Sequence, residues 1–299
     1  MAVEEIAKVR RSENFEHLVK KHPCFHGEAH AKYGRIHLPV SPACNIQCRF
    51  CQRGFNKCEE RPGVSRGIVS PEQAIELIEK ALTLCPEITV VGIAGPGDTL
   101  ATDHALRTFA LVQRHYPQLL KCLSTNGLLL AARSDEIVAV AVNSVTVTVN
   151  ADTPETLTRI VSHVQYQGER LLGLPAAQTL IPAQLAGIAA IAQQGIVVKI
   201  NTVLIPGVNE HEIAAIARKT SALGASIMNI IPLIPQHEMS GLPAPSCQLL
   251  NAARAQAEPY LTVFRHCKQC RADACGIPGK EIDLADQLYD HAPMTFSHG

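Results

Sequence analysis

The sequence has no excess of charge of either sign. Its 27 lysines and arginines balance its 27 aspartates and glutamates, so the formal net charge at pH 7 is zero. This balance argues against a nucleic acid or an anionic membrane surface as the main partner, because both attract a surplus of positive charge. It leaves room for a local basic pocket that takes a charged small molecule.

The sequence also lacks a hydrophobic run long enough to suggest a membrane span. A spanning helix needs about 20 consecutive apolar residues, and the most apolar stretch, residues 128–149, is interrupted by polar and charged residues at 133–136. The first 13 residues contain no apolar segment of the signal-peptide type. We therefore expect a cytoplasmic protein. Hydrophobic residues make up 46% of the 299 residues, which is enough for a large core.

Six apolar stretches alternate with helical patterns along the chain. The expected strands cover residues 35–40, 88–94, 119–124, 144–149, 196–204 and 226–231. The expected helices that follow or separate them cover residues 70–84, 102–115, 133–141, 154–163, 182–194 and 210–222. Continuous apolar strands separated by helices are typical of a parallel sheet that is buried on both faces. The pattern predicts an α/β fold that closes as a barrel or a partial barrel.

Local sequence motifs predict where some helices begin, and composition divides the chain into three segments. The motif Ser70-Pro-Glu-Gln73 predicts a helix start with a capping box. Thr153 or Asp152 is expected to cap another helix, and Ser134 is a candidate cap. We expect an N-terminal helical segment over residues 1–21, a barrel over 22–234 and a C-terminal extension over 235–299. The extension is rich in proline and cysteine, so we expect no further strand–helix unit in it, and residues 289–299 are expected to form a loose tail.

The eleven cysteines are concentrated near the two ends of the chain. Five lie between residues 24 and 58, and three lie between residues 267 and 275. Thiols in the cytoplasm stay reduced, which disfavours disulfides, and cysteines that merely fill a core would be scattered. The clustering indicates metal ligation. Cys85 and Cys247 match no motif, and we interpret them as packing residues.

The most specific motif is Cys44-Asn-Ile-Gln-Cys48-Arg-Phe-Cys51, in the loop after the first expected strand. Three thiolates within eight residues can bind one 4Fe–4S cube and leave its fourth iron open to an external ligand. A structural zinc site that borrows Cys58 is the alternative, although zinc sites usually pair two C-x2-C motifs.

This motif and its position resemble the radical S-adenosylmethionine (SAM) superfamily. The resemblance implies a partial (β/α)6 barrel in which the open iron binds SAM and an electron from the cluster cleaves SAM to a 5′-deoxyadenosyl radical. Catalysis would then depend on the Cys44, Cys48 and Cys51 cluster. The residues implied to lie around SAM come from the segments after the second, third and fourth strands: Gly95, Gly97, Asp98, Ser124, Asn126 and Asn150.

A closer resemblance, to the NifB family, runs from about residue 22 to residue 280. It rests on His22-Pro-Cys24, His37-Leu-Pro-Val, Cys122-Leu-Ser-Thr-Asn-Gly127 and Cys267-Lys-Gln-Cys270, besides the Cys44 motif. The resemblance implies two auxiliary 4Fe–4S clusters, with ligands among Cys24, His37, Cys58, Cys122, Cys267 and Cys270. Which auxiliary cluster Cys24 joins stays open. Cys58 sits one residue later than in the usual family motif, and Cys275 is an additional thiol.

The family resemblance implies an activity. Such an enzyme would fuse two auxiliary clusters and insert a SAM-derived carbide to make the nitrogenase cofactor precursor, with Glu59 or Glu60 as a candidate proton relay. It would need an electron donor such as ferredoxin and a cluster carrier or assembly scaffold, and it lacks the carrier domain of long family members. Two alternatives remain: a radical SAM enzyme that acts on another substrate such as a peptide, and a non-catalytic iron–sulfur scaffold.

Overall fold

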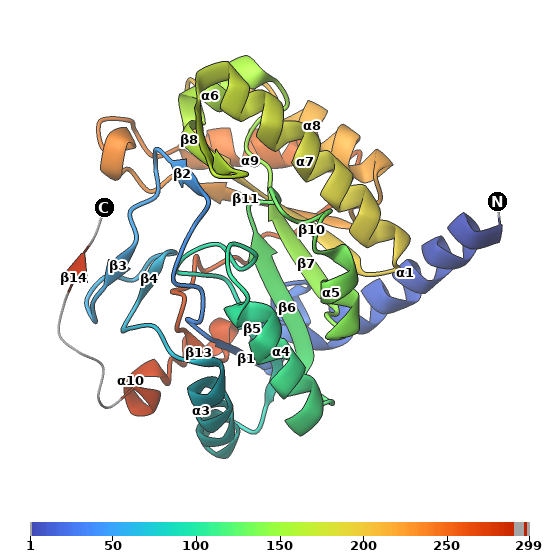
Figure 1. Ribbon diagram of the computed structural model, residues 1–299, viewed down its shortest axis with the longest axis vertical. Coiled ribbons are helices and arrows are strands. Elements are labelled where there is room, and N and C mark those ends of the chain that lie inside the picture. Colours follow the sequence, from blue (N-terminus) through green and yellow to red (C-terminus); the bar gives the residue numbers. More distant parts are fainter. Residues whose placement is uncertain (1, 290–295, 298–299) are drawn as a thin grey trace.

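A computed structural model describes residues 2–289 and 296–297. Its centre is a mixed eight-stranded sheet in the order β12-β11-β10-β7-β6-β5-β1-β13 (Figure 1). The six expected strands are all present and pair in parallel, as β1 (Gly34–His37), β5 (Ile88–Ile93), β6 (Leu120–Thr125), β7 (Ser144–Thr148), β10 (Val197–Leu204) and β11 (Ile227–Pro232). The α/β fold with a partial barrel is therefore confirmed.

Helices connect the strands and cover the outside of the sheet. In chain order they are α1 (Ala2–Lys21), α2 (Gly27–Lys32), α3 (Pro71–Leu84), α4 (His104–His115), α5 (Ser134–Ala139), α6 (Pro154–Ile160), α7 (Gly173–Gln193), α8 (Ile213–Ala222), α9 (Cys247–Ala257) and α10 (Ala285–Leu288). Two short 3-10 turns, η1 (His237–Met239) and η2 (Pro278–Lys280), lie in the C-terminal part.

The predicted helix caps are partly correct. Ser70 accepts a hydrogen bond from the Gln73 backbone and the Gln73 side chain accepts one from the Ser70 backbone, so the capping box of α3 is confirmed. Thr153 caps α6. The prediction for Ser134 is wrong: Arg133 occupies the cap position of α5, and Ser134 is already the first helical residue.

The strands divide their side chains between two environments with a period of two. On β10, Val198, Ile200 and Leu204 belong to the hydrophobic core between sheet and helices, whereas Lys199 and Asn201 line a cavity inside the barrel. The same alternation holds on β1, β6 and β7, where the inward residues are polar, and β11 contributes both Asn229 and Ile231. The barrel interior is therefore a hollow chamber whose wall combines apolar side chains with a set of polar ones.

Three segments of the chain differ from the sequence-based expectation. Residues 161–172 form a hairpin, β8 (Val161–Tyr166) and β9 (Glu169–Leu172), which pairs with β2 (Ile46–Cys48). The expected helix over 154–163 therefore ends three residues early. The turn at 167–168 has positive φ at both residues, which suits a tight hairpin connection.

The second difference is in α7, which begins nine residues earlier than expected, because Pro182 is accommodated inside the helix.

The third difference is in the C-terminal extension. Helix α9 is followed by β12 (Thr262–Val263), which pairs in parallel with β11, so the expectation of no further strand–helix unit is wrong. A two-residue strand leaves no apolar run for the sequence to reveal. The chain then crosses to the other edge, where β13 (Cys275–Gly276) pairs antiparallel with β1.

The expected loose tail is wrong for the described residues at its two ends. Tyr289 is buried in the core. Strand β14 (Phe296–Ser297) pairs with β3 (Gly54–Phe55), which also pairs with β4 (Val64–Ser65). The rest of the predicted tail lies outside the described residues.

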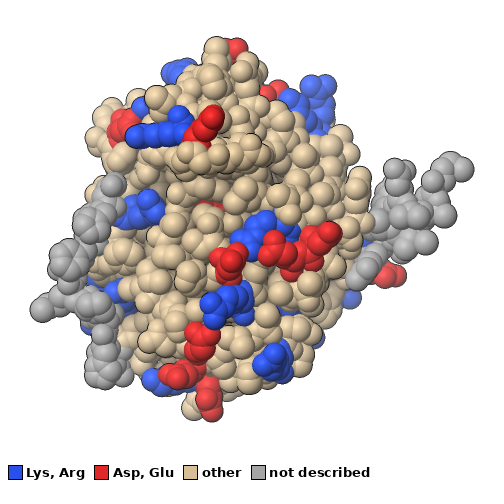
Figure 2. Space-filling model, in the orientation of Figure 1, with Lys and Arg blue, Asp and Glu red and all other residues tan. Residues whose placement is uncertain are grey.

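One helix, α7, is long and apolar enough to cross a membrane by length and composition. The sequence reading overlooked it in favour of residues 128–149. Nine of its residues are buried within the fold, which is how a core helix behaves. The visible face of the molecule mixes acidic and basic side chains without separating them by sign (Figure 2), consistent with the balanced composition.

Candidate functional site

Two adjoining cavities occupy the inside of the barrel. The smaller one lies between the Cys44–Cys51 loop and the carboxyl ends of β5, β6 and β7. The larger one, with a volume of about 340 Å³, is lined by all six parallel strands and by two segments from the ends of the chain, residues 22–30 and 264–270. Cys51, Ser124 and Thr148 line both cavities. Groups held in the two cavities would therefore face each other.

The three cysteines of the Cys44 motif all line the smaller cavity. Gln47 shapes their loop, because its side-chain amide donates to the carbonyls of Cys48 at 3.0 Å and of Cys51 at 2.9 Å. Burial raises the pKa of Cys44 to about 11, and it raises the pKa of Cys48 and Cys51 as well. Without iron these groups are neutral thiols, so cluster binding must release their protons.

The Gly95–Asp98 turn is built against the same loop. The Gly97 backbone N–H donates to Ser41 O at 2.8 Å, and the Asp98 N–H donates to Ala43 O at 2.8 Å. A Cβ at Gly97 would lie 2.1 Å from Ala43 O, so only glycine permits this approach. The Asp98 carboxylate is buried and accepts from Thr125 Oγ1 and from two backbone N–H groups. Its evident role is to hold the end of β6 in place.

The remaining residues predicted around SAM also line the smaller cavity. Asn126 donates to Asn45 Oδ1 at 2.6 Å and so ties β6 to the cysteine loop. Asn150 is buried, and its Oδ1 accepts from Val203 N at 2.9 Å. Ser124 lies at the boundary between the cavities. Of the six predicted residues, only Gly95 does not line this cavity; it supports the turn with a φ of +134°, a conformation that favours glycine.

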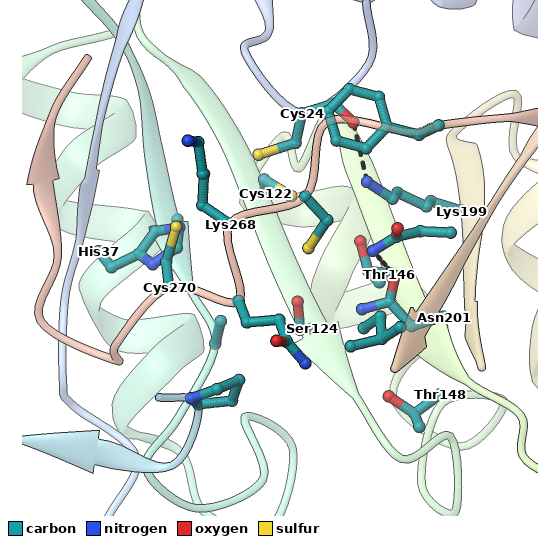
Figure 3. A pocket seen from close by; sticks show the side chains of 18 of the residues that line it. Cys24, His37, Cys122, Ser124, Thr146, Thr148, Lys199, Asn201, Lys268 and Cys270 are labelled. Atoms are coloured by element: carbon teal, nitrogen blue, oxygen red, sulfur yellow. Dashed lines mark hydrogen bonds between the residues drawn. The ribbon is translucent and has the colours of Figure 1, made fainter. Parts of the chain in front are cut away.

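Besides Cys51, four cysteines line the larger cavity together with His37, one of its histidines (Figure 3). Cys122 lies on β6 and Cys24 follows α1, while Cys267 and Cys270 belong to the segment after β12. Burial raises the pKa of Cys24 to about 12, and burial likewise raises the pKa of Cys122. Residues that are more than 240 positions apart in sequence thus meet across one chamber.

His37 is held in a defined orientation at the wall of this cavity. Its Nδ1 lies 3.1 Å from the carbonyl oxygen of Arg271. Since that oxygen can only accept, Nδ1 carries the hydrogen and Nε2 keeps its lone pair. Burial lowers the pKa of His37 to about 4, so the ring is neutral. Gly92 makes room for it, because a Cβ there would lie 2.8 Å from His37 Cδ2.

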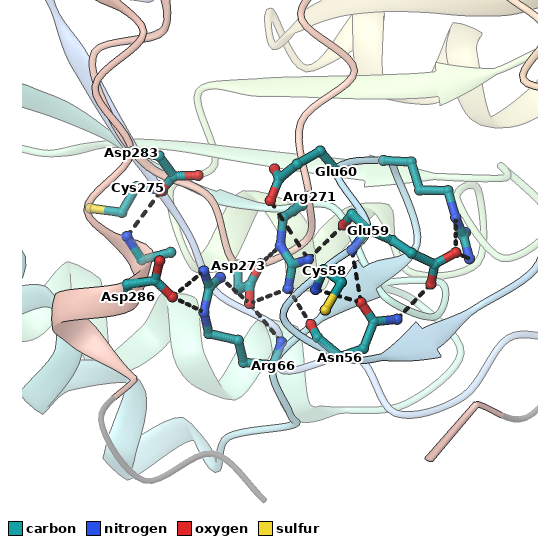
Figure 4. Close-up of polar contacts among 12 residues, drawn as sticks. Asn56, Cys58, Glu59, Glu60, Arg66, Arg271, Asp273, Cys275, Asp283 and Asp286 are labelled. Atoms are coloured by element: carbon teal, nitrogen blue, oxygen red, sulfur yellow. Dashed lines mark hydrogen bonds and ion pairs between the residues drawn. The ribbon is translucent and has the colours of Figure 1, made fainter. Parts of the chain in front are cut away.

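A buried ion network, the Arg271 clasp, holds the C-terminal cysteine segment against the loop between β3 and β4 (Figure 4). The Arg271 guanidinium donates to Asp273 at 2.8 Å, to Glu59 O at 2.6 Å and to Asn56 O at 2.7 Å. Asp273 is fully buried and also accepts from the Arg66 backbone and side chain. The clasp therefore joins residues 56–66 to residues 271–273.

Besides Gly95, two predicted site residues, Cys58 and Glu60, lie outside both cavities. Cys58 is exposed in the loop between β3 and β4, where its N–H donates to Asn56 Oδ1 at 3.0 Å. The Glu60 side chain is 69% exposed and lies 4.0 Å from Arg271. Both stay predictions. Cys85 and Cys275 are buried and Cys247 is exposed, and none of the three lines either cavity.

The sequence reading missed the basic residues of the larger cavity. Arg35, Lys199 and Lys268 all line it, and Arg35 Nη2 donates to Cys270 Sγ at 3.2 Å. A signal was present, because each of Arg35 and Lys199 interrupts an apolar strand at an inward position. Polar residues two apart on successive strands mark a polar interior.

The donor groups suit iron–sulfur clusters better than a single metal ion. Thiolates and imidazole are the ligands that such clusters use. Across residues 2–289 and 296–297 no three His, Cys, Asp or Glu side chains converge as they do around one ion. A cube, by contrast, takes ligands at separate corners. Three cysteines on one loop and five candidate ligands spread around a chamber of this size fit the expected groups.

Comparisons with known proteins agree with this arrangement. Residues 38–220 match the radical SAM superfamily model. The fold is similar to a radical SAM methyltransferase from Sphaerobacter thermophilus (16% identity, TM-score 0.55, 77% of this chain and 64% of that one). It is also similar to methylornithine synthase (15% identity, TM-score 0.51, 87% and 70%). The chain belongs to the radical SAM superfamily and is an enzyme that uses a 4Fe–4S cluster and SAM.

Relatives with similar sequences identify the family within the radical SAM superfamily. The chain is 44% identical over 283 residues to the FeMo cofactor biosynthesis protein NifB of Methanocaldococcus infernus, covering 94% of this chain and 93% of that protein. It is 42% identical to the NifB of Klebsiella pneumoniae, covering 87% of this chain but only 57% of that longer protein. The chain belongs to the NifB family.

Proposed function

We propose that this enzyme assembles the iron–sulfur precursor of the nitrogenase cofactor. It would fuse two 4Fe–4S clusters and insert a carbon atom derived from SAM. The observation that carries the proposal is the pair of adjoining cavities. One holds the three-cysteine loop, the other adds four further cysteines and His37, and Cys51, Ser124 and Thr148 are common to both. The relatives from Methanocaldococcus, which are named FeMo cofactor biosynthesis proteins, support the same conclusion.

The smaller cavity is the proposed site of radical generation. Cys44, Cys48 and Cys51 would hold a 4Fe–4S cluster that, when bound, supplies the electron for reductive cleavage of SAM. The turn containing Gly95 and Gly97 brings backbone close to this loop. Asp98 keeps that turn and the end of β6 in register, and Ser124, Asn126 and Asn150 supply polar groups around the bound SAM.

The larger cavity is the proposed site of the two substrate clusters. Cys24, Cys122, Cys267, Cys270 and His37 are the proposed ligands. The fixed tautomer of His37 presents Nε2 as a neutral ligand, with the Arg271 carbonyl orienting the ring. A neutral imidazole binds iron less firmly than a thiolate, which suits a cluster that must leave. Cys58 and Glu60 would join in only if the β3–β4 loop moved, as a further ligand and a proton relay.

The remaining expectations follow from this chemistry. We propose a cytoplasmic location, an electron donor such as ferredoxin, and a cluster carrier or nitrogenase assembly scaffold that accepts the product. We also keep the division into an N-terminal helical segment (1–21), a barrel (22–234) and an extension (235–299), although β12 and β13 of the extension belong to the barrel sheet.

Anaerobic reconstitution tests the proposal. The full chain is loaded with iron and sulfide, treated with SAM and dithionite, and the released cluster is assayed by activation of apo-nitrogenase. We expect 5′-deoxyadenosine and an activating cluster from the unaltered chain and from the control variant Cys247→Ala, because Cys247 is exposed and lines neither cavity. If SAM is cleaved but no cluster leaves the protein, the auxiliary clusters are fixed relays and cofactor assembly is refuted.

A further inference from the structure

Lys199 is a buried lysine that forms no ion pair with the carboxylates of the described residues. It lies in the middle of β10, is 4% exposed and lines the larger cavity. Its ammonium donates to Cys24 O at 2.8 Å and lies 4.5 Å and 5.5 Å from the ring centroids of Phe264 and Phe25. Within the part of the chain that the structure describes, no carboxylate forms an ion pair with it. A buried charge that is stabilised only by a carbonyl and two aromatic faces is costly unless another charge approaches it.

The other charged residues that line the cavity are also basic. Among the described residues, no aspartate or glutamate lines it, whereas Arg35 and Lys268 do. His22 Nδ1 accepts from the Cys24 backbone at 3.1 Å, so its Nε2 carries the hydrogen. That Nε2 and Arg35 Nε are buried donors with no partner among the described groups. The face of the molecule seen in Figure 2 mixes both signs, whereas the lysine and arginine side chains that line this chamber meet no carboxylate among its described lining residues.

We propose that Lys199 supplies the fixed positive charge that retains an anionic iron–sulfur cluster in the larger cavity and favours its reduced form. The inference rests on the proposed function, because it takes clusters to be bound there. The core of an oxidised 4Fe–4S cube is positively charged, but three thiolate ligands outweigh that charge, so a cube that they bind is anionic, and it becomes more negative on reduction. A nearby ammonium therefore stabilises the reduced form most, and cluster potentials respond to charge and hydrogen bonds of this kind.

Proximity to the thiols supports this role. Lys199 lines the same cavity as the candidate ligands Cys24 and Cys122, and its ammonium donates to the carbonyl oxygen of Cys24 itself. The charge is thus placed beside side chains that would bind a cluster. In strand register Lys199 lies opposite Thr146 of β7 (Figure 3), and the strands paired on both sides of β10 fix its position.

A merely structural role is the competing explanation, since the ammonium also tethers the Cys24 segment through Cys24 O. Lys199→Gln separates the two roles because an amide can still donate a hydrogen bond but carries no charge. Lys199→Met removes both, and Lys199→Arg keeps the charge. Lys121→Met is the matched control: Lys121 is 2% exposed on the neighbouring region of the sheet, but it bonds Gln113 and lines neither cavity.

The measurements are iron content after anaerobic reconstitution, cluster midpoint potentials by EPR-monitored redox titration, and thermal unfolding of the chain without iron. We expect Lys199→Gln and Lys199→Met to make reduction of the cavity cluster about tenfold less favourable, equivalent to about 59 mV for a one-electron step. They should also lose cavity iron to a chelator faster. Lys199→Arg and Lys121→Met should match the unaltered chain, and the Cys44 cluster should keep its SAM-cleaving activity throughout.

Other outcomes overturn the inference. If Lys199→Gln folds and keeps both the potential and the iron retention of the unaltered chain, the charge has no role. If Lys199→Arg fails in the same way as Lys199→Met, packing rather than charge explains the loss. Failure of the proposed function would look different, because the unaltered chain itself would then release no cluster that activates apo-nitrogenase, whatever the Lys199 variants do to potential and iron retention.

Discussion

Replacement of Arg271 by methionine should loosen the C-terminal cysteine segment without reaching the SAM side of the barrel. The guanidinium is fully buried and donates to the Asp273 carboxylate and to two backbone carbonyls of the β3–β4 loop. Removing one partner of a buried ion pair costs about 3–5 kcal/mol. Asp273 keeps its bonds to Arg66, which places the expected loss of unfolding free energy near the lower end, about 3 kcal/mol.

Loss of the Arg271 side chain should also affect the candidate ligands, because the backbone around Arg271 contacts His37 and β4. Arg271 O accepts from His37 Nδ1, and the Ala272 N–H donates to Val64 O at 2.8 Å. If the segment shifts, His37 loses its orienting acceptor and the two C-terminal cysteines lose their place. We therefore expect reconstituted Arg271→Met to lose iron equivalent to about one cube and to lose nitrogen hyperfine coupling in pulsed EPR, while it still forms 5′-deoxyadenosine.

A matched control separates this effect from general destabilisation. Arg133 makes a similar fork, to the carbonyls of Leu100 and Thr102 and to Asp103, and lines neither cavity. Arg133→Met should lower the midpoint of urea unfolding but leave iron content and nitrogen coupling unchanged. Full iron content and unchanged hyperfine coupling in Arg271→Met would refute the clasp as a positioning device.

Three further predictions test the two cavities. Cys44→Ala, Cys48→Ala or Cys51→Ala should each abolish formation of 5′-deoxyadenosine, because two thiolates cannot hold the cube with one iron free; normal cleavage in any one of them contradicts the assignment. Cys267→Ala combined with Cys270→Ala should lower iron content by about one cube while SAM binding persists, and loss of all clusters from a folded variant would show that the sites are not separate. Burial raises the pKa of Cys44 to about 11 above its ordinary value near 9, so the folded iron-free chain holds this proton more tightly than the unfolded chain. The contribution to stability is complete below pH 9 and is lost as pH rises through 11; urea midpoints measured between pH 8 and 11 should therefore fall less in Cys44→Ala than in the unaltered chain.

The sheet was predictable because its strands are long and apolar. Each of the six expected strands appears within a few residues of its predicted range, since a strand buried on both faces leaves a continuous apolar run in the sequence. The β8–β9 hairpin and β12 were not predictable in this way. Residues 161–166 follow a helix without a break in composition, and β12 has only two residues, so its pairing depends on α9 returning the chain to the sheet edge.

The site was predictable where chemistry is concentrated in a short motif. The cysteines of the Cys44 motif line the smaller cavity. The ligands implied by the family resemblance, apart from Cys58, line the larger one: Cys24, His37, Cys122, Cys267 and Cys270. Lys199 and Arg271 were missed for different reasons. A single lysine in an apolar strand gives no spacing to recognise, and the partners of Arg271 are backbone carbonyls more than 200 residues away.

The candidate ligands of the larger cavity are not held equally firmly, and this difference bears on how a product could leave. His37 and Cys122 lie on β1 and β6, whose backbones pair with strands on both sides. They cannot move without breaking the sheet. Cys267 and Cys270 lie between β12 and β13 in a segment with no ladder of its own, secured by the Arg271 clasp and by a bond from Gln269 to Pro232 O. Opening that segment breaks these side-chain bonds and the Ala272–Val64 backbone bond rather than a ladder of the central sheet, so we expect the cavity to release its contents past the C-terminal cysteines.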